Sequence, residues 1–270
     1  MTDFGAFPQL AMDFEGAGDG RERALAILLL SMADDEFVIG FSDSEWTGIG
    51  PLLEEDVAIS SLAQDELGHA QALYRLLAET VADGRDADAW AYDRPPEGYF
   101  HARLLDHPRG DWAATIARRY LYDTADTARL EALAESSHRP LAELVAKIRR
   151  EERYHVMHVG IWLERLADAG GEPRRRLTSA LESLASDAGT VLSPLPGETA
   201  LVRHGIIREP FAAIEGRWRA DVGAAFGRLG LPALSPTAAP DRGRIDHSDA
   251  FRTLHAEFTM VRRSEATATW

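Results

Sequence analysis

Two short motifs in this chain place a carboxylate and an imidazole one helical turn apart. The first pairs Glu66 with His69, and the second pairs Glu152 with His155. Both pairs stand in a helical apolar pattern, at positions that core side chains normally occupy, so the motifs are expected to face inward. Burying an unpaired carboxylate costs roughly several kcal/mol, and each motif therefore requires a neutralising partner.

The presence of two such helices indicates a dimetal site. Two Glu-x-x-His helices, with one inward acid from each of two further helices, form the ligand set of di-iron and dimanganese four-helix bundles. Glu36 interrupts the apolar face of an earlier helix and precedes Glu66 by 30 residues. Asp123 interrupts a later helix and precedes Glu152 by 29 residues, so both predicted hairpins repeat one layout.

The predicted metal ligands are four carboxylates and two imidazoles: Glu36, Glu66, His69, Asp123, Glu152 and His155. Carboxylate oxygens together with imidazole nitrogens suit iron or manganese, and bridging carboxylates can hold two ions close together. Two iron ions are the expected cofactor, with manganese as the alternative, because two divalent ions would cancel the four negative charges. The four acids of this set are also the expected catalytic groups.

Other acids near these positions are weaker candidates. Asp34 and Asp35 point away from the apolar face that contains Glu36. Asp126 is the rival to Asp123, but it lies one position off the apolar pattern of its helix.

The residues beside the two motifs are expected to support the ligands. Asp65 and Glu151 immediately precede the motif glutamates and should point sideways, where they could accept a hydrogen bond from an imidazole. His158 follows His155 by three residues but falls off the apolar pattern, so a supporting or surface position is expected.

Four long helices must position these groups, and apolar periodicity predicts them over residues 21–46, 51–81, 111–136 and 140–169. The expected fold class is all-α: a four-helix bundle over residues 21–170, preceded by a loose arm at 1–20. A long crossover at 84–110 connects the second and third helices, and its aromatic residues are expected to pack it down. Further helices near 174–190, 210–229 and 249–261 should pack on the bundle or on a partner.

Composition excludes several other classes of protein. The chain has 270 residues and a formal net charge of -15, which argues against nucleic-acid binding. It has no cysteine, so disulfides, thiolate zinc sites and iron-sulfur clusters are excluded. No apolar run approaches the roughly 18 residues of a membrane span. A cytoplasmic location is expected, because residues 1–5 lack the basic start of a secretory signal.

Several segments resemble the PaaA and PaaC subunits of phenylacetyl-CoA ring epoxidases. The resemblance covers about residues 21–170 and rests on Asp35-Glu36-Phe37, Ser44-Glu45-Trp46, residues 50–56, Gln64-Asp65-Glu66-Leu67-Gly68-His69 and Glu151-Glu152-Arg153-Tyr154-His155. The length, the segment 163–166 and the ending Ala268-Thr269-Trp270 are more similar to PaaC. PaaC proteins typically lack a full ligand set, whereas PaaA proteins hold the di-iron centre; this chain keeps all six ligand positions.

The resemblance implies a ferritin-like di-iron subunit of a multicomponent monooxygenase that epoxidises the aromatic ring of a CoA thioester. Electrons would come from NADPH through a separate reductase, and a homologous ferritin-like subunit would be the partner in a dimer or hetero-oligomer. Five arginines could meet CoA phosphates, although a solvated face explains them all: Arg118, Arg119, Arg149, Arg150 and Arg153. Two alternatives stay open: a noncatalytic structural partner in such a complex, and a dimanganese catalase or ferritin-like metal protein.

Overall fold

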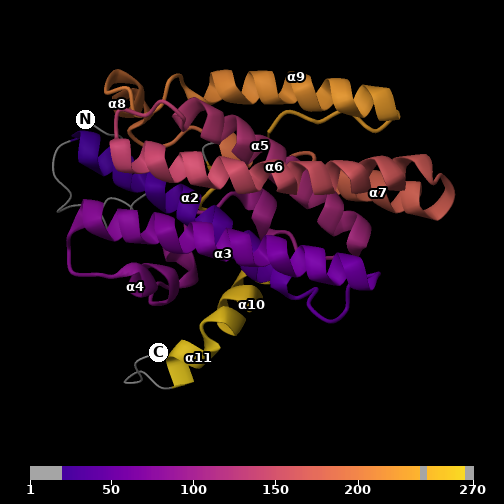
Figure 1. The fold of residues 1–270 in the computed structure, drawn as a ribbon, viewed down its shortest axis with the longest axis horizontal. Helices are drawn as coiled ribbons and strands as arrows, with labels where there is room; N and C mark the ends of the chain where they lie inside the picture. The colour runs from indigo at the N-terminus through magenta and orange to yellow at the C-terminus, as the bar shows by residue number, and fades with distance from the viewer. Residues whose placement is uncertain (1–19, 238–241, 265–270) are drawn as a thin grey trace.

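The computed structural model describes residues 20–237 and 242–264, and the regular structure within these ranges is entirely helical. Four long helices lie side by side as a bundle (Figure 1): α2 (Gly20–Ser44), α3 (Leu53–Val81), α5 (Trp112–Leu133) and α6 (Arg139–Asp168). Each begins and ends within a few residues of its predicted range. The predicted fold class, an all-α ferritin-like bundle with extra C-terminal helices, is confirmed. The arm predicted at 1–20 lies outside the described residues, apart from Gly20.

The crossover between α3 and α5 is packed against the bundle. It contains the short helix α4 (Ala87–Tyr92) and the 3-10 turns η1 (Pro96–Gly98) and η2 (Arg103–Asp106). Trp90 and the neighbouring aromatic residues Tyr99 and Phe100 are buried. The expectation that aromatic side chains hold this segment down is confirmed.

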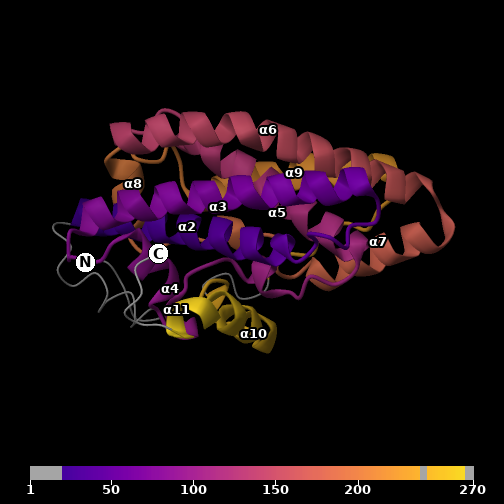
Figure 2. The ribbon, with the colours of Figure 1, turned by 60° about the horizontal axis from the view of Figure 1, so that its bottom comes forward.

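The C-terminal part of the chain adds helices around the bundle: α7 (Gly171–Leu184), η3 (Thr190–Leu192), α8 (Glu198–Arg203), α9 (Phe211–Leu229), α10 (Asp249–Phe258) and α11 (Met260–Ser264). Helices α7 and α9 contact α5, whereas α8 and α10 contact α2. Figure 2 shows α10 and α11 on the side of the bundle away from α6. Within the described ranges, no helix is both long and apolar enough to cross a bilayer.

Helix α2 is surrounded rather than exposed on one face. Every residue from Ala24 to Gly40 is buried, because α3, α8, α10 and η2 all pack on it. The expectation that Asp34 and Asp35 face away from the interior is therefore wrong, since both side chains are fully buried. Their neutralisation comes from arginines outside α2, which pair with each carboxylate in the interior.

Gly40 marks a close approach of α2 to α3 beside Glu66. A Cβ atom at this position would lie 3.0 Å from Leu67 Cγ, 3.1 Å from Glu66 Cβ and 3.2 Å from the carbonyl oxygen of Ala63. Glu36 stands one turn before Gly40 on the same face of α2. The missing side chain thus sets the helix spacing at which Glu36 and Glu66 face each other.

Replacing Gly40 with valine should lower the free energy of unfolding by about 1–3 kcal/mol, because the added methyl groups would force α2 away from α3. Gly68→Ala is the matched control, since a Cβ atom there meets no atom within 4 Å. That change should be neutral or stabilising by up to about 1 kcal/mol. Urea unfolding followed by circular dichroism measures both, and an unchanged stability of the Gly40→Val protein would contradict this account of the contact.

Candidate metal centre

The six predicted ligands lie in the interior of the bundle, on all four of its long helices. Glu36 comes from α2, Glu66 and His69 from α3, Asp123 from α5, and Glu152 and His155 from α6. Each of the six residues is at most 1% exposed. Charged groups of this kind are rarely buried unless they are paired or bind a cation.

Four of the six converge on one point around His69. The Nδ1 atom of His69 lies 3.3 Å from Glu36 Oε2, 3.6 Å from Glu66 Oε2 and 3.7 Å from Glu152 Oε1. One donor atom from each of these four residues lies within 4.8 Å of all the others. This spacing would let the four side chains surround a single ion.

His155 lies on the other side of the two motif glutamates. Its Nδ1 atom is 3.0 Å from Glu152 Oε1 and 3.4 Å from Glu66 Oε1. The rings of His69 and His155 are 6.2 Å apart between centroids. Glu66 and Glu152 therefore lie within reach of both imidazoles.

The acids that precede the motifs hold the imidazoles from outside, each reaching across to the opposite helix. Glu151 Oε2 lies 2.8 Å from His69 Nε2, and Asp65 Oδ2 lies 3.3 Å from His155 Nε2. The expectation of such hydrogen bonds is confirmed. These contacts orient each ring so that its Nδ1 atom faces the carboxylates. His158 instead pairs with Glu55 at 3.2 Å.

Asp123 is paired with a buried arginine. Arg119 Nε lies 3.3 Å from Asp123 Oδ1, and Arg119 Nη1 lies 2.6 Å from Glu66 Oε1. The expectation that Arg118 and Arg119 lie on a solvated face is wrong, because both are at most 2% exposed. A helical spacing that fits Asp123 also fits Arg119, four residues earlier on α5, and this signal could have revealed the contact.

Asp126, the rival to Asp123, is also buried and is held by an arginine. The Arg129 guanidinium hydrogen-bonds Asp126 and places Nη1 2.6 Å from Asp35 Oδ2. Asp126 therefore has a counter-charge within its own helix.

The converging carboxylates have oxygen atoms without hydrogen-bond partners. The buried, unpartnered oxygens are Glu36 Oε1, Glu66 Oε2, Glu152 Oε1 and Oε2, and Asp123 Oδ1 and Oδ2. Each such atom costs about 1–3 kcal/mol when left unpaired. Oxygen donors with an imidazole nitrogen match the ligand preferences of iron and manganese. The cluster around His69 thus fits a divalent ion.

The carboxylates of the cluster have pKa values shifted in opposite directions. Burial raises the pKa of Glu36 well above its ordinary value, and the neighbouring Glu66 carboxylate raises it further. Burial also opposes ionisation of Glu66, but the charge of Arg119 outweighs it and holds the pKa of Glu66 well below the usual range. Burial raises the pKa of Asp123 in spite of Arg119.

Both imidazoles hold a proton strongly when no metal is bound. Burial opposes the charge on His69, but hydrogen bonds with Glu36 and Glu66 raise its pKa to about 12. Burial likewise opposes the charge on His155, whereas Glu152 and Glu66 raise its pKa to about 11. A metal ion must displace these protons before the nitrogens can ligate it.

A cavity of about 330 Å³ lies between α5 and α6 and reaches the cluster at Glu152. Its remaining lining includes Thr127 on α5 and three arginines of α6, Arg149, Arg150 and Arg153. Arg149 is half-buried, and the other two arginines are exposed. The hydroxyl of Thr127 is buried without a hydrogen-bond partner. This cavity connects the surface with one of the predicted ligands.

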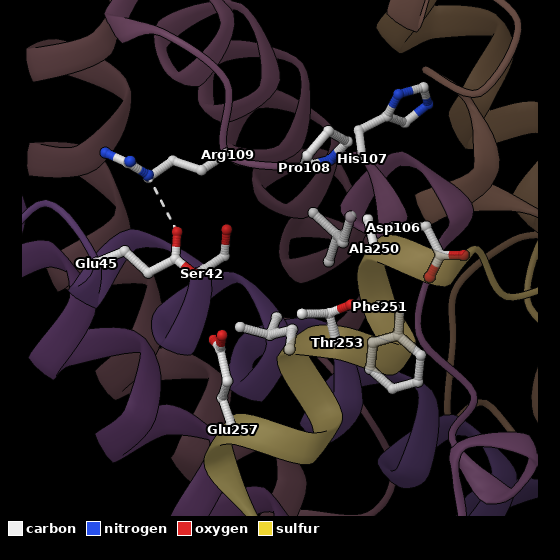
Figure 3. Close-up of a pocket in the computed structure, with 12 residues that line it drawn as sticks. Ser42, Glu45, Asp106, His107, Pro108, Arg109, Ala250, Phe251, Thr253 and Glu257 are labelled. Carbon is white, nitrogen blue, oxygen red and sulfur yellow. Dashed lines mark ion pairs between the residues drawn. The ribbon is translucent and has the colours of Figure 1, made fainter.

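A separate cavity of about 250 Å³ lies beside α10 (Figure 3). Glu45 and Arg109 form an ion pair of 3.0 Å at its edge, and Phe251 and Glu257 line it from α10. None of the six predicted ligands lines this cavity. It is therefore distinct from the candidate metal centre.

A second His and Asp cluster joins the crossover to the C-terminal segment. His101 Nε2 lies 2.5 Å from Asp106 Oδ1, and the His101 and His247 rings stack with centroids 4.4 Å apart. The other oxygen of Asp106 accepts a hydrogen bond from the Ser248 amide, and His247 Nε2 lies 2.9 Å from the carbonyl oxygen of Tyr99. Asp106 and His247 therefore join the crossover to the C-terminal segment, whereas His101 Nδ1 is buried without a hydrogen-bond partner.

Metal-free protein should lose stability as the pH rises from about 7 to about 9. The folded pKa values of His69 and His155 exceed the unfolded value of about 6.5, so the stabilisation is fully present below that pH and is lost at higher pH. The expected loss is about 1 kcal/mol per pH unit for each histidine. Urea unfolding with a chelator present measures it. The His69→Gln protein should show a shallower slope, and a pH-independent stability of the unaltered chain would contradict the assignment.

Comparison with known proteins identifies two relatives from one enzyme complex, the 1,2-phenylacetyl-CoA epoxidase of Escherichia coli (strain K12). Its C component is 28% identical over 240 residues, which cover 88% of this chain and 96% of that relative. Its A component is 28% identical over 124 residues, or 46% of this chain and 39% of that relative. The model of the phenylacetic acid catabolic protein family matches residues 11–270, and the chain therefore belongs to that family.

Proposed function

We propose that this chain is a metal-binding subunit of a multicomponent oxygenase that epoxidises the aromatic ring of an aryl-CoA thioester such as phenylacetyl-CoA. The observation that carries the proposal is the buried cluster of Glu36, Glu66, His69 and Glu152, with unpartnered carboxylate oxygens. The match to one epoxidase component over nearly its whole length supports the choice of reaction.

The protein's own groups would hold iron and control its surroundings. Glu36, Glu66, His69 and Glu152 would ligate the ion, and Glu151 would orient His69 from outside. Bound iron would supply oxygen activation, in which one atom of O₂ enters the ring and the other leaves as water. The two electrons would come from NADPH through a separate reductase. Burial of the four ligating residues excludes bulk water from the reaction.

The cavity at Glu152 is the proposed route for the substrate. Its volume of about 330 Å³ is of the size that ligand pockets have, at the lower end of the usual range. The guanidinium groups of Arg149, Arg150 and Arg153 could bind phosphate groups at its rim, because arginine pairs well with phosphate oxygens. The aromatic ring would then enter the cavity while the CoA part stays at the surface.

An apolar surface on α3 and α6 is the proposed contact with a homologous ferritin-like subunit. Leu53 and Val57 of α3 are 76% and 61% exposed, and Met157 of α6 is 54% exposed. The contact between Glu55 and His158 joins the two helices at this place, so these side chains share one region of the surface. Exposed apolar side chains gathered in this way are typical of protein interfaces.

A second candidate is a noncatalytic partner in the same complex, with catalysis performed by the homologous protein. Two observations favour it. Arg119 lies among the predicted ligands, and the match covers 96% of the C component of the epoxidase but 39% of the A component. Both candidates place the chain in one complex. They differ in whether its own cluster is required for turnover.

The proposal is tested by reconstituting the chain with a PaaA-like partner from the same source, a reductase, NADPH and phenylacetyl-CoA. Oxygen-dependent epoxide, detected by mass spectrometry, should appear only when this chain is present. A metal-binding catalytic role predicts that Glu152→Gln lowers turnover by about 100-fold or more, because a ligand is lost. Glu164→Gln is the control, since Glu164 is an exposed acid of the same helix.

The outcomes separate the candidates. Full turnover with the Glu152→Gln chain, in a complex that still assembles, would establish the noncatalytic role. Failure of the wild-type chain to form a complex or to support epoxidation would contradict both.

A further inference from the structure

The positively charged side chain of Arg119 lies next to Asp123. Arg119 is fully buried, and its guanidinium lies within ion-pair distance of acids from three helices. Its Nη1 atom is 2.6 Å from Glu66 Oε1 on α3 and 3.4 Å from Asp43 Oδ2 on α2. Its Nε atom is 3.3 Å from Asp123 Oδ1 on its own helix.

We infer that Arg119 takes the place of a second metal ion, so that the centre binds one ion, at Glu36, Glu66, His69 and Glu152. This inference rests on the proposed metal centre and states how many ions it holds. It does not depend on which reaction the chain supports.

The six predicted ligands form two overlapping groups, one around each histidine, which share Glu66 and Glu152. Around His69, four residues bring one donor atom each within 4.8 Å of one another. The Glu66 oxygen that lies near His69 is Oε2, whereas Arg119 contacts Oε1. Around His155, the acids are Glu66, Glu152 and Asp123. In this group around His155, Arg119 contacts Glu66 and Asp123 directly. A metal ion there would meet a guanidinium that already uses these two carboxylates.

The positive charge of Arg119 acts against a second metal ion. The carboxylates of Glu36, Glu66, Asp123 and Glu152 carry four negative charges when ionised, and Arg119 cancels one of them. With all four acids ionised, one divalent ion leaves a net charge of -1, whereas two leave a net charge of +1 directly beside the guanidinium. Repulsion between like charges is strong in a site from which water is excluded.

Arg119 keeps its positive charge and is held in position by its contacts. A guanidinium stays protonated under all ordinary conditions, and its planar fork matches several carboxylates at once. Asp43 is itself held by Arg118 at 3.0 Å, which fixes the far side of the contact. The arrangement is therefore a fixed part of the interior.

The inference is tested first on the unaltered chain. Metal-free protein is titrated with Mn²⁺, and bound metal is counted by elemental analysis after removal of free ion. One Mn²⁺ per chain is expected, with the electron paramagnetic resonance signal of an isolated ion. Two ions per chain with a spin-coupled signal would overturn the inference, and so would the absence of any bound ion.

Variants then test the role of Arg119. Arg119→Gln removes the charge and should raise the bound Mn²⁺ from one to two per chain, with a spin-coupled signal. Arg119→Lys keeps a positive charge and should stay at one. Arg118→Gln also removes a buried arginine, but Arg118 contacts Ser42, Asp43 and the His107 carbonyl rather than the cluster, so the count should stay at one.

The results also separate this inference from the proposed function. A folded Arg119→Gln protein that still binds one ion would overturn the inference even if the wild-type complex epoxidises its substrate. If the Arg119→Gln protein does not fold, the number of Mn²⁺ ions bound by the unaltered chain and its electron paramagnetic resonance signal decide whether the inference holds. One Mn²⁺ per chain in a protein that joins no epoxidase complex would support the inference and contradict the function.

Discussion

The need to neutralise carboxylates inside the bundle governs this structure. Helix α2 alone carries four fully buried acids, Asp34, Asp35, Glu36 and Asp43. A buried carboxylate without a counter-charge would destabilise the fold by roughly several kcal/mol, which is comparable to the net stability of a domain. Three of the four are paired with arginines. Among the described residues, the counter-charge of Glu36 is His69 rather than an arginine, and its other oxygen has no hydrogen-bond partner. The proposed metal ion would bind this carboxylate.

The same constraint explains how distant parts of the chain are joined. Arg94 of the crossover pairs with Asp34, and its Nη1 atom lies 3.0 Å from Asp34 Oδ2. Arg244 of the C-terminal segment reaches Asp35 with two hydrogen bonds, of 2.9 and 3.0 Å. The crossover and a segment that follows the bundle in sequence thus complete the interior around α2. The part of the chain beyond residue 170 contributes counter-charge as well as apolar contacts.

Local sequence patterns were sufficient to predict the four-helix bundle and most residues of the cluster. Apolar periodicity predicts the four long helices, and polar residues that interrupt it identify Glu36, Glu66 and His69. The reason is that inward position within one helix depends mainly on its own 3.6-residue period. The confirmed contacts of Asp65 and Glu151 follow from the same rule, since they stand beside inward residues.

The arginine contacts between different helices and segments could not be predicted in this way. Asp34 and Asp35 look outward on the helical pattern of α2, and they are buried because the crossover and the C-terminal segment cover that face. From the sequence alone, Arg119 is expected to be exposed to solvent, because most arginines in proteins are exposed. Its burial depends on acids contributed by α2 and α3, which no single helical pattern reveals. The number of cations in the centre therefore depends on tertiary contacts.

Anomalous diffraction from crystals of the iron-loaded protein tests the central claim most directly, because it locates each metal ion among the side chains. The account predicts one peak, within bonding distance of Glu36, Glu66, His69 and Glu152, with Arg119 still between Glu66 and Asp123. A peak between Asp123 and His155, with Arg119 turned away, would contradict it. Protein that shows no peak at all would contradict it equally.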